Sequence, residues 1–272
     1  MEKNFKKNGF AKRLKTMLAV DMRRMFISPF FYIVVASCFV MPVLILVMTT
    51  MMDGTVSVNP QTGVETVVEG FDNVWQIIGT VGGASAGGDA AAMEMGLTTM
   101  CNINMLYFLI SVLVCVFVCG DFRSGYAKNL LTVRAKKTDY VASKTIVCSL
   151  GAAAMVLAFF LGSMIGGAIS GLPFAMEGFG AGELAMCVIS KTLLVAVFVP
   201  IYLVMSVISK QKTWLAIILS MMVGLFLFMM IPMLTPLDST VMNVVLCLAG
   251  GALFGFGLGA VSNAILKKTA LV

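Results

Sequence analysis

The 272-residue chain contains no histidine, and only 12% of its residues are charged. Without histidine, Ser-His and Cys-His nucleophile pairs and histidine-ligated metal sites are excluded. No lysine follows a glycine, so the GxxxxGK(S/T) loop that binds ATP phosphates is absent as well. Paired carboxylates within the apolar runs, which a proton-coupled carrier or an intramembrane hydrolase needs, are also lacking. We therefore predict no catalytic residue, no metal and no cofactor in this chain.

Cysteine occurs seven times, but without a CxxC spacing, and six of the seven cysteines lie within apolar runs. This pattern indicates neither a disulfide framework nor a metal site. We interpret these cysteines as small packing residues of helices.

Long apolar runs dominate the rest of the chain. Hydrophobic residues make up 60% of the sequence and the mean hydropathy is +1.00, whereas soluble domains are roughly 45–50% apolar. A helix of roughly 20 apolar residues crosses the hydrocarbon core of a bilayer with its backbone polar groups satisfied. The sequence therefore predicts an all-α integral membrane protein with six transmembrane helices, formed by a single transmembrane domain over residues 1–272. The predicted spans are residues 29–52, 98–120, 145–169, 184–208, 213–235 and 241–265.

The cations fix the predicted orientation. Eight Lys or Arg residues precede the first span, six lie in the segment 121–144, two lie between the fourth and fifth spans, and two follow the last span. The loops on the opposite side carry carboxylates and no Lys or Arg. Short cationic flanks stay in the cytoplasm, so we predict a plasma-membrane protein with both termini cytoplasmic and an external loop at 53–97. The basic pI of about 9.0 comes from these cytoplasmic cations, which face anionic lipid. No nucleic-acid partner is therefore predicted.

An amphipathic helix is predicted at residues 10–27, before the first span. Its apolar residues recur at intervals of three and four, which is typical of a helix lying in the membrane interface. Ser28-Pro29 then supplies an N-cap and a proline at a first helical position. The apolar face comprises Phe10, Leu14, Met17, Leu18, Met22 and Met25.

The external loop carries a hairpin signal. Residues 56–58 and 64–67 alternate around Asn59-Pro60-Gln61-Thr62-Gly63, which predicts two short strands. The Gly/Ala-rich segment 79–92 is either a close-packed or a flexible return.

Two further features lie inside the predicted spans. Glycines spaced by four residues let helix backbones approach closely, either within one subunit or between two. Lys191 is the only formal charge inside a span, about eight residues from the outer end. Its side chain either snorkels outward to Glu183 or Glu177, which we favour, or faces a substrate path. The helix-packing glycines are Gly162, Gly166, Gly251, Gly255 and Gly259.

The segment 121–144 is too long and too polar for a simple turn. Tyr126, Leu130 and Val133 fall on one helical face, and Thr138-Asp139-Tyr140 opens a second short helix that runs into the third span. A short cytoplasmic helix with an apolar face needs a surface on which to dock. A solvated, lipid-facing basic loop is the alternative interpretation.

This segment resembles the coupling segment of ABC-2 type permeases, the membrane subunits of one class of ABC exporters. An acidic residue and an arginine end the second span, a glycine and a short leucine-containing helix follow, and a basic turn leads to Tyr140 and Ser143-Lys144. Val133-Arg134-Ala135 stands where the family usually has a proline. The interfacial helix, the six spans and the large first outer loop agree with the resemblance. The residues that match the coupling segment are Asp121, Phe122, Arg123, Gly125, Tyr126, Leu130, Arg134 and Lys144.

The resemblance implies a division of labour. Two permease subunits, identical or different, enclose a path in the bilayer, and two separate ATPase subunits bind ATP and Mg²⁺ beneath them. ATP-driven closure is transmitted through a cytoplasmic coupling helix, here Phe122 to Leu131, and the exported substrate is a hydrophobic or amphipathic molecule such as an antibiotic, an antimicrobial peptide or a lipid-like compound. Two other functions remain open from the residues alone. One is a secondary carrier or channel component without an ATPase, and the other is an immunity or scaffold membrane protein that binds a peptide.

Overall fold

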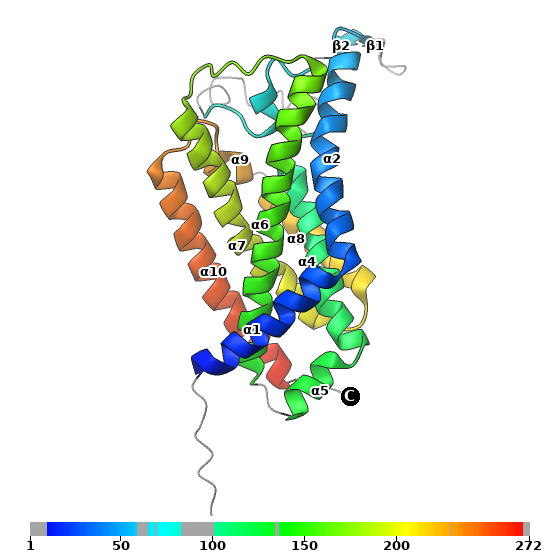
Figure 1. Ribbon diagram of the computed structural model, residues 1–272, viewed down its shortest axis with the longest axis vertical. Coiled ribbons are helices and arrows are strands. Elements are labelled where there is room, and N and C mark those ends of the chain that lie inside the picture. The colour runs from blue at the N-terminus through cyan, green and yellow to red at the C-terminus, as the bar shows by residue number, and fades with distance from the viewer. Residues whose placement is uncertain are drawn as a thin grey trace, which may run out of the picture.

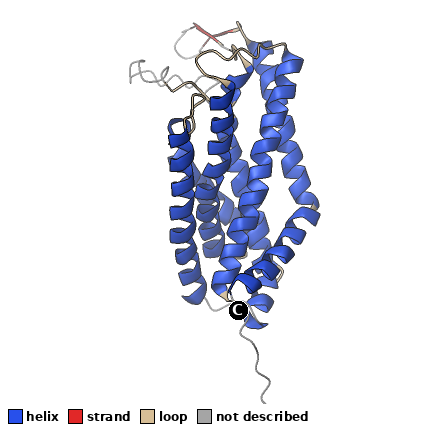
Figure 2. Cartoon of the chain, turned by 60° about the vertical axis from the view of Figure 1, so that its left-hand side comes forward, coloured by secondary structure: helices blue, strands red, loops and turns tan. Residues whose placement is uncertain are grey.

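The computed structural model describes residues 10–58, 65–68, 70–82, 101–133, 136–228 and 230–268. It is an all-helical bundle with one small hairpin, in which the long helices run along the major axis and α1 (Phe10–Ile27) lies obliquely across one end (Figure 1). We call this the basic end, because α1, α5 (Tyr126–Val133) and the final Lys267-Lys268 of α10 (Val241–Lys268) lie there. The opposite end holds the hairpin and the loops, and we call it the acidic end (Figure 2).

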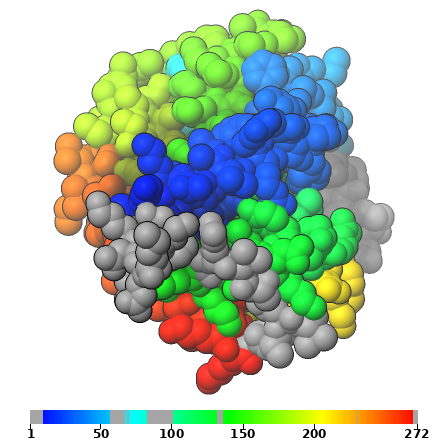
Figure 3. Space-filling view, turned by 60° about the horizontal axis from the view of Figure 1, so that its bottom comes forward, coloured from blue at the N-terminus to red at the C-terminus, as the bar shows by residue number. Residues whose placement is uncertain are grey.

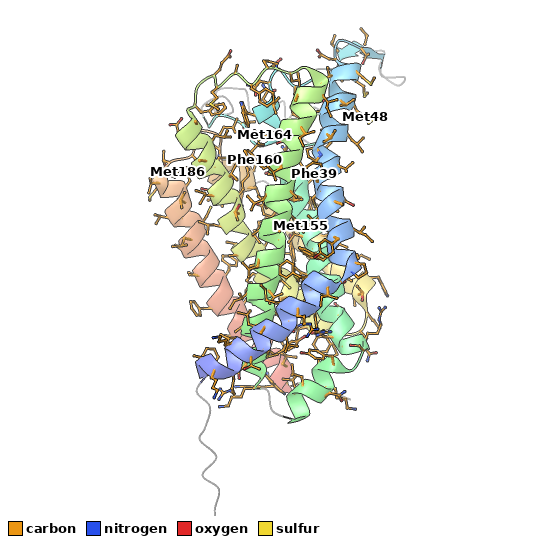
Figure 4. All side chains as sticks on the ribbon, viewed as in Figure 1. Phe39, Met48, Met155, Phe160, Met164 and Met186 are labelled. Carbon is orange, nitrogen blue, oxygen red and sulfur yellow. The ribbon has the colours of Figure 1, made fainter. Side chains whose placement is uncertain are left out.

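Among the residues that the structure describes, five helices are long and apolar enough to cross a membrane: α2 (Pro29–Met52), the segment Ile103–Arg123, α6 (Lys137–Ser170), α7 (Ala181–Ser209) and α10. In the segment Ile103–Arg123, the 3₁₀ helix η2 (Ile103–Met105) leads into α4 (Leu106–Arg123). The multi-pass membrane architecture predicted from the sequence is therefore confirmed. The apolar surface of the bundle includes exposed side chains such as Met48 and Met164 (Figure 4).

Two predicted spans differ from the structure. The second was expected to begin at residue 98, but residues 98–100 lie outside the described part of the chain and the α-helix begins at Leu106. The fifth, expected at 213–235, is described as the 16-residue α8 (Thr213–Phe228) and the short α9 (Met230–Leu234), and residue 229 between them lies outside the described residues. α8 alone is shorter than a full crossing of roughly 20 residues.

The corner between α1 and α2 follows the sequence signal. Ser28 adopts extended backbone angles and Pro29 is the first residue of α2, where its fixed φ suits the helix and its missing N–H has no partner to lose. The environment of the apolar face of α1 differs from the prediction, which placed this helix in the membrane interface. Met17 and Met25 are buried against the protein, and Leu18 and Met22 pack partly against the same core. The apolar face of α1 thus covers the bundle, while Phe10 is 51% exposed.

Small residues set the closest helix contacts. A methyl group at Gly162 would collide with the carbonyl of Phe39, and one at Gly166 would lie 2.8 Å from the Cα of Val43, so both glycines bring α6 against α2. Gly251 similarly allows α10 to approach Ala196 of α7. The other two predicted packing glycines behave differently, because a side chain at Gly255 would meet nothing within 4 Å and one at Gly259 would make only an ordinary contact. Of the α10 stripe, only Gly251 makes a tight helix contact within this chain.

The acidic end is closed by the first loop. The strands β1 (Val56–Val58) and β2 (Glu65–Val67) pair antiparallel, as predicted, with Val56 opposite Val67. The 3₁₀ helix η1 (Val74–Ile77) inserts between the helix ends with Val74 fully buried beside Gly167. The segment after η1 is tied to the α9–α10 connection, since Leu237 donates a backbone hydrogen bond to Thr80. The remainder of the Gly/Ala-rich return, residues 83–92, lies outside the described residues.

Candidate functional site

Lys144 is the centre of a buried charged cluster at the basic end. It lies in the second turn of α6, its side chain has no solvent exposure, and its Nζ is 2.8 Å from Asp21 Oδ1 and 2.7 Å from Asp121 Oδ2. Asp21 comes from α1 and Asp121 from the last turn of α4, so one ammonium group joins three helices. Both carboxylates are themselves fully buried.

Arg24 completes this cluster from the exposed side. Its Nη2 lies 2.8 Å from Asp121 Oδ1 and its Nη1 lies 3.8 Å from Asp21 Oδ1. With two cations and two carboxylates the cluster has no net formal charge, and we call Asp21, Arg24, Asp121 and Lys144 the charged quartet. Burial by itself would lower the pKa of Arg24, but the charges of Asp121 and Asp21 outweigh it and raise the pKa above its ordinary value. Arg24 therefore stays protonated throughout the accessible pH range.

Hydroxyl groups and aromatic rings complete the coordination of the quartet. Tyr140 donates to Asp121 Oδ2 at 3.1 Å, and Ser143 donates to Asp21 Oδ2 at 2.6 Å. The Lys144 ammonium lies 4.0 Å from the ring centre of Phe117, and the Arg24 guanidinium lies 3.8 Å from that of Tyr126. Such stacking of a cation on a ring is attractive and strengthens as water is removed. Tyr126 is the first residue of α5, so the quartet also contacts this short helix.

The arrangement is sensitive to the loss of any member. A buried ion pair gains little over an apolar pair of the same shape, whereas removing one partner leaves an uncompensated charge and is strongly destabilising. The members of the quartet therefore depend on one another, because the loss of one leaves a buried opposite charge without compensation. Asp21 Oδ1 and both carboxylate oxygens of Asp121 lie within 4.0 Å of a cation, and Asp21 Oδ2 accepts a hydrogen bond from Ser143. Within the described residues no group of three or more metal-ligating side chains occurs.

A second ion pair ties α1 to the start of α6. Arg13 Nε lies 2.8 Å from Asp139 Oδ2, and the Asp139 side chain is 2% exposed. Beside it, Lys137 Nζ donates to the carbonyl oxygen of Leu266 in the last turns of α10. In the view onto the basic end, α1 lies across this face beside the α5 segment (Figure 3). The helix ends at this face are thus connected to one another by polar contacts.

α5 differs in extent from the predicted coupling helix. The prediction placed Phe122 to Leu131 in one helix, but Phe122 and Arg123 belong to α4, and the turn at Ser124-Gly125 separates the two helices. Gly125 has φ +74°, a left-handed conformation that favours glycine and allows α5 to turn away from α4. The predicted second short helix at residues 138–140 is instead the beginning of the continuous α6.

The predicted coupling residues fall into three groups. Asp121, Tyr126 and Lys144 meet in the charged cluster, and Phe122 packs its ring against Tyr140. Leu130 is partly buried against the bundle, while Arg123 is exposed. Arg134 lies outside the described residues, and so does the side chain of Val133.

Sequence reasoning missed Asp21 and Arg24. The available signal was an aspartate in the middle of the apolar face of α1, four residues from both Met17 and Met25. A carboxylate at such a position needs a buried cation as partner. The sequence offered no means of choosing Lys144, which lies 123 residues away.

The intramembrane charge Lys191 is not where the favoured interpretation placed it. Its side chain is 1% exposed and donates to Thr235 Oγ1 at 2.9 Å and to Asn104 Oδ1 at 3.5 Å. Glu183, the expected partner, instead accepts a hydrogen bond from the backbone of Gly180 at the start of α7. The snorkelling interpretation is therefore wrong, and Lys191 points into the bundle. No carboxylate oxygen of the described residues lies within 4.0 Å of its amine.

The comparison with protein families decides what kind of molecule this is. A model of the ABC-2 family transporter proteins matches residues 27–227. The chain belongs to this family. It is an ABC-2 type permease, a transport subunit of the membrane, and the resemblance found in the coupling segment is confirmed. Searches of curated proteins and of solved structures gave no match. The matched region contains Asp121 and Lys144 but begins after Arg24, so the α1 half of the quartet lies outside it.

Proposed function

We propose that this permease is the membrane subunit of an ATP-driven exporter, with its basic end in the cytoplasm and a separate ATPase docked beneath α5. The observation that carries the proposal is the charged quartet, which joins α1, α4 and α6 and stacks on the first residue of α5. A force applied to α5 from below reaches α1 through the contact of Tyr126 with Arg24, and reaches α4 and α6 through the ion pairs of the quartet. That is the mechanical connection required of a subunit that has no phosphate-binding loop of its own.

The orientation proposal rests on charge. α1, α5, the α7–α8 turn with Lys210 and Lys212, and the end of α10 all lie at the basic end. Cationic flanks of this kind stay in the cytoplasm, which places both termini there and places the hairpin outside the plasma membrane. We propose that α8 and α9 together form the fifth of six crossings, because the chain passes from Lys212 at the basic end to Asp238 at the acidic end through these two helices.

The remaining components follow from the family. We propose that a second permease subunit, identical or homologous, completes the path, and that two ATPase subunits supply ATP and Mg²⁺. The exported substrate is proposed to be hydrophobic or amphipathic, which suits an apolar bundle whose described intramembrane residues include one buried lysine and few other charges.

Cross-linking to the ATPase tests the proposal. Lys128 lies on the exposed side of α5, and Gln76 lies in η1 at the acidic end. In membranes that contain both proteins, a cysteine at position 128 should cross-link to the ATPase with a short bifunctional reagent. A cysteine at position 76 is the matched control and should give no adduct. An adduct from position 76, or none from position 128 in an assembled complex, would refute the docking site.

A further inference from the structure

A crevice lies beside the charged quartet, at the corner where α1 meets α2 and against one face of α4. Its volume is about 270 Å³ and it is open on one side. The lining from α4 follows a single helical face, since Leu113, the neighbours Val116 and Phe117, and Gly120 recur at intervals of three or four residues, and Ser124 follows directly after the helix. The lining from the α1–α2 corner comprises Arg24, Met25, Ser28, Phe30 and Phe31.

The crevice is polar at one end and apolar at the other. Arg24 and Ser124 lie toward the basic end, whereas Phe117, Val116 and Leu113 follow at increasing depth along α4. From Ser124 to Leu113 the helix rises about 16 Å, at roughly 1.5 Å per residue. A ligand that fits this gradient has a polar head near the membrane surface and an apolar tail directed into the bilayer.

The polar end favours an anion. Arg24 is the only charged residue in the lining, and none of the lining residues is acidic. The Arg24 side chain is 34% exposed, although its Nη1 is buried beside Asp21 Oδ1, so a ligand meets the exposed remainder of the guanidinium. A guanidinium has five N–H donors, so its ion pairs with two aspartates leave bonding capacity for a third anionic group. Arg23 and Arg123, adjacent in sequence to Arg24 and Ser124, are also exposed at this end.

We propose that this crevice is a binding site for a resident anionic phospholipid, whose headgroup phosphate meets Arg24 and whose acyl chain lies along the Leu113–Gly120 face of α4. The volume admits the head and the first part of one chain, and the rest of the lipid lies in the surrounding bilayer. The bound lipid is a constituent of the permease and not its cargo. Because Arg24 also holds Asp121, the lipid contacts the same residue that joins α1 to α4.

Gly120 offers a way to block the crevice without touching the quartet. A side chain added at Gly120 would meet nothing within 4 Å, so Gly120→Leu places an isobutyl group in the crevice. Gly255 of α10 is the matched control, because a side chain there also meets nothing within 4 Å and the residue is not part of the crevice lining. Val116→Trp fills the crevice from a second position, and Arg24→Gln removes its charge.

Native mass spectrometry of the purified full-length chain tests the proposal. The chain is titrated in detergent with phosphatidylglycerol, with phosphatidylcholine of the same acyl chains, and with glycerol 3-phosphate. We expect one phosphatidylglycerol to be retained about fivefold more tightly than phosphatidylcholine, the ratio given by one cation at a membrane surface. Gly120→Leu and Val116→Trp should abolish this retention, Gly255→Leu should keep it, and Arg24→Gln should remove the preference for the anionic lipid.

Three results would overturn the proposal. Equal retention of the two lipids would show that Arg24 does not select the headgroup. Unchanged retention in both Gly120→Leu and Val116→Trp would place the lipid elsewhere. Displacement by glycerol 3-phosphate would identify a soluble phosphate as the ligand. Circular dichroism of each variant establishes that a loss of lipid is not a loss of fold.

Discussion

Lys144 and Asp121 meet at 2.7 Å between Nζ and Oδ2, each with a fully buried side chain. The pair joins the first turns of α6 to the last turn of α4, and through Arg24 and Asp21 it extends to α1. Lys144, Asp21 and Asp121 are fully buried, so separating these three groups would require the helices that carry them to move apart.

Removing one member of the quartet should destabilise the fold more than removing an oppositely charged pair. Lys144→Met leaves two buried carboxylates with one cation, and we expect a loss of about 3–5 kcal/mol. Adding Asp21→Asn restores electrical balance, so the double variant should be more stable than Lys144→Met alone. Thermal unfolding of the detergent-solubilised chain measures the difference. Strictly additive losses would show that the two groups do not interact energetically.

Tyr126 should make the α5 attachment sensitive to alkaline pH. Burial raises the pKa of this phenol above its ordinary value. The folded state therefore prefers the protonated form, and its contribution to stability is present below about pH 10 and lost as the pH rises through the higher folded-state pKa. Tyr126→Phe should keep the ring beneath Arg24 and remove this dependence, whereas Tyr126→Ala should lose the stacking, worth about 0.5–1 kcal/mol. Proteolysis of the α4–α5 turn as a function of pH is the measurement. A Tyr126→Phe variant with an unchanged alkaline transition would contradict the assignment.

Docking of the ATPase at α5 should depend on the apolar Leu130 more than on the charge of Lys128. Leu130 is partly buried against the bundle and Lys128 is exposed. Leu130→Asp should detach α5, abolish co-purification of the ATPase and leave membrane insertion intact, whereas Lys128→Ala should have a mild effect. An ATPase complex that assembles and couples normally with aspartate at position 130 would favour the alternative interpretation, in which the segment is a lipid-facing basic loop.

Features that depend on local sequence were predicted, whereas features that depend on contacts between helices were not. The bounds of α2 were predicted at both ends, because Ser28-Pro29 and a continuous apolar run define them. The direction faced by α1 was not predicted, since periodicity shows which residues share a face and not what covers it. The same limit hid Asp21 and Arg24, whose partners lie on other helices.

Lys191 should tolerate an apolar replacement. Its amine is held by Thr235 and Asn104, with no carboxylate of the described residues within ion-pair distance. Lys191→Met leaves no charge behind, and we expect thermal stability to be unchanged or higher. Thr235→Val withdraws the 2.9 Å acceptor from the amine, and should destabilise by about 1–3 kcal/mol. A Lys191→Met variant that fails to fold would show that the charge is structurally required.

The quartet should make α1 and α5 move as one body, and a distance measurement between spin labels tests this coupling directly. The first two labels replace Val20 of α1 and Lys128 of α5, which are exposed at the basic end. The third label replaces Met48 of α2, which is 60% exposed and lies far from the basic end. In liposomes containing the permease and its ATPase, the distance from 20 to 128 should be the same without nucleotide and with the ATPase trapped by vanadate, while the distance from 48 to 128 changes. In Lys144→Met the first distance should also change on trapping. A 20-to-128 distance that changes in the unmodified quartet would contradict the claim.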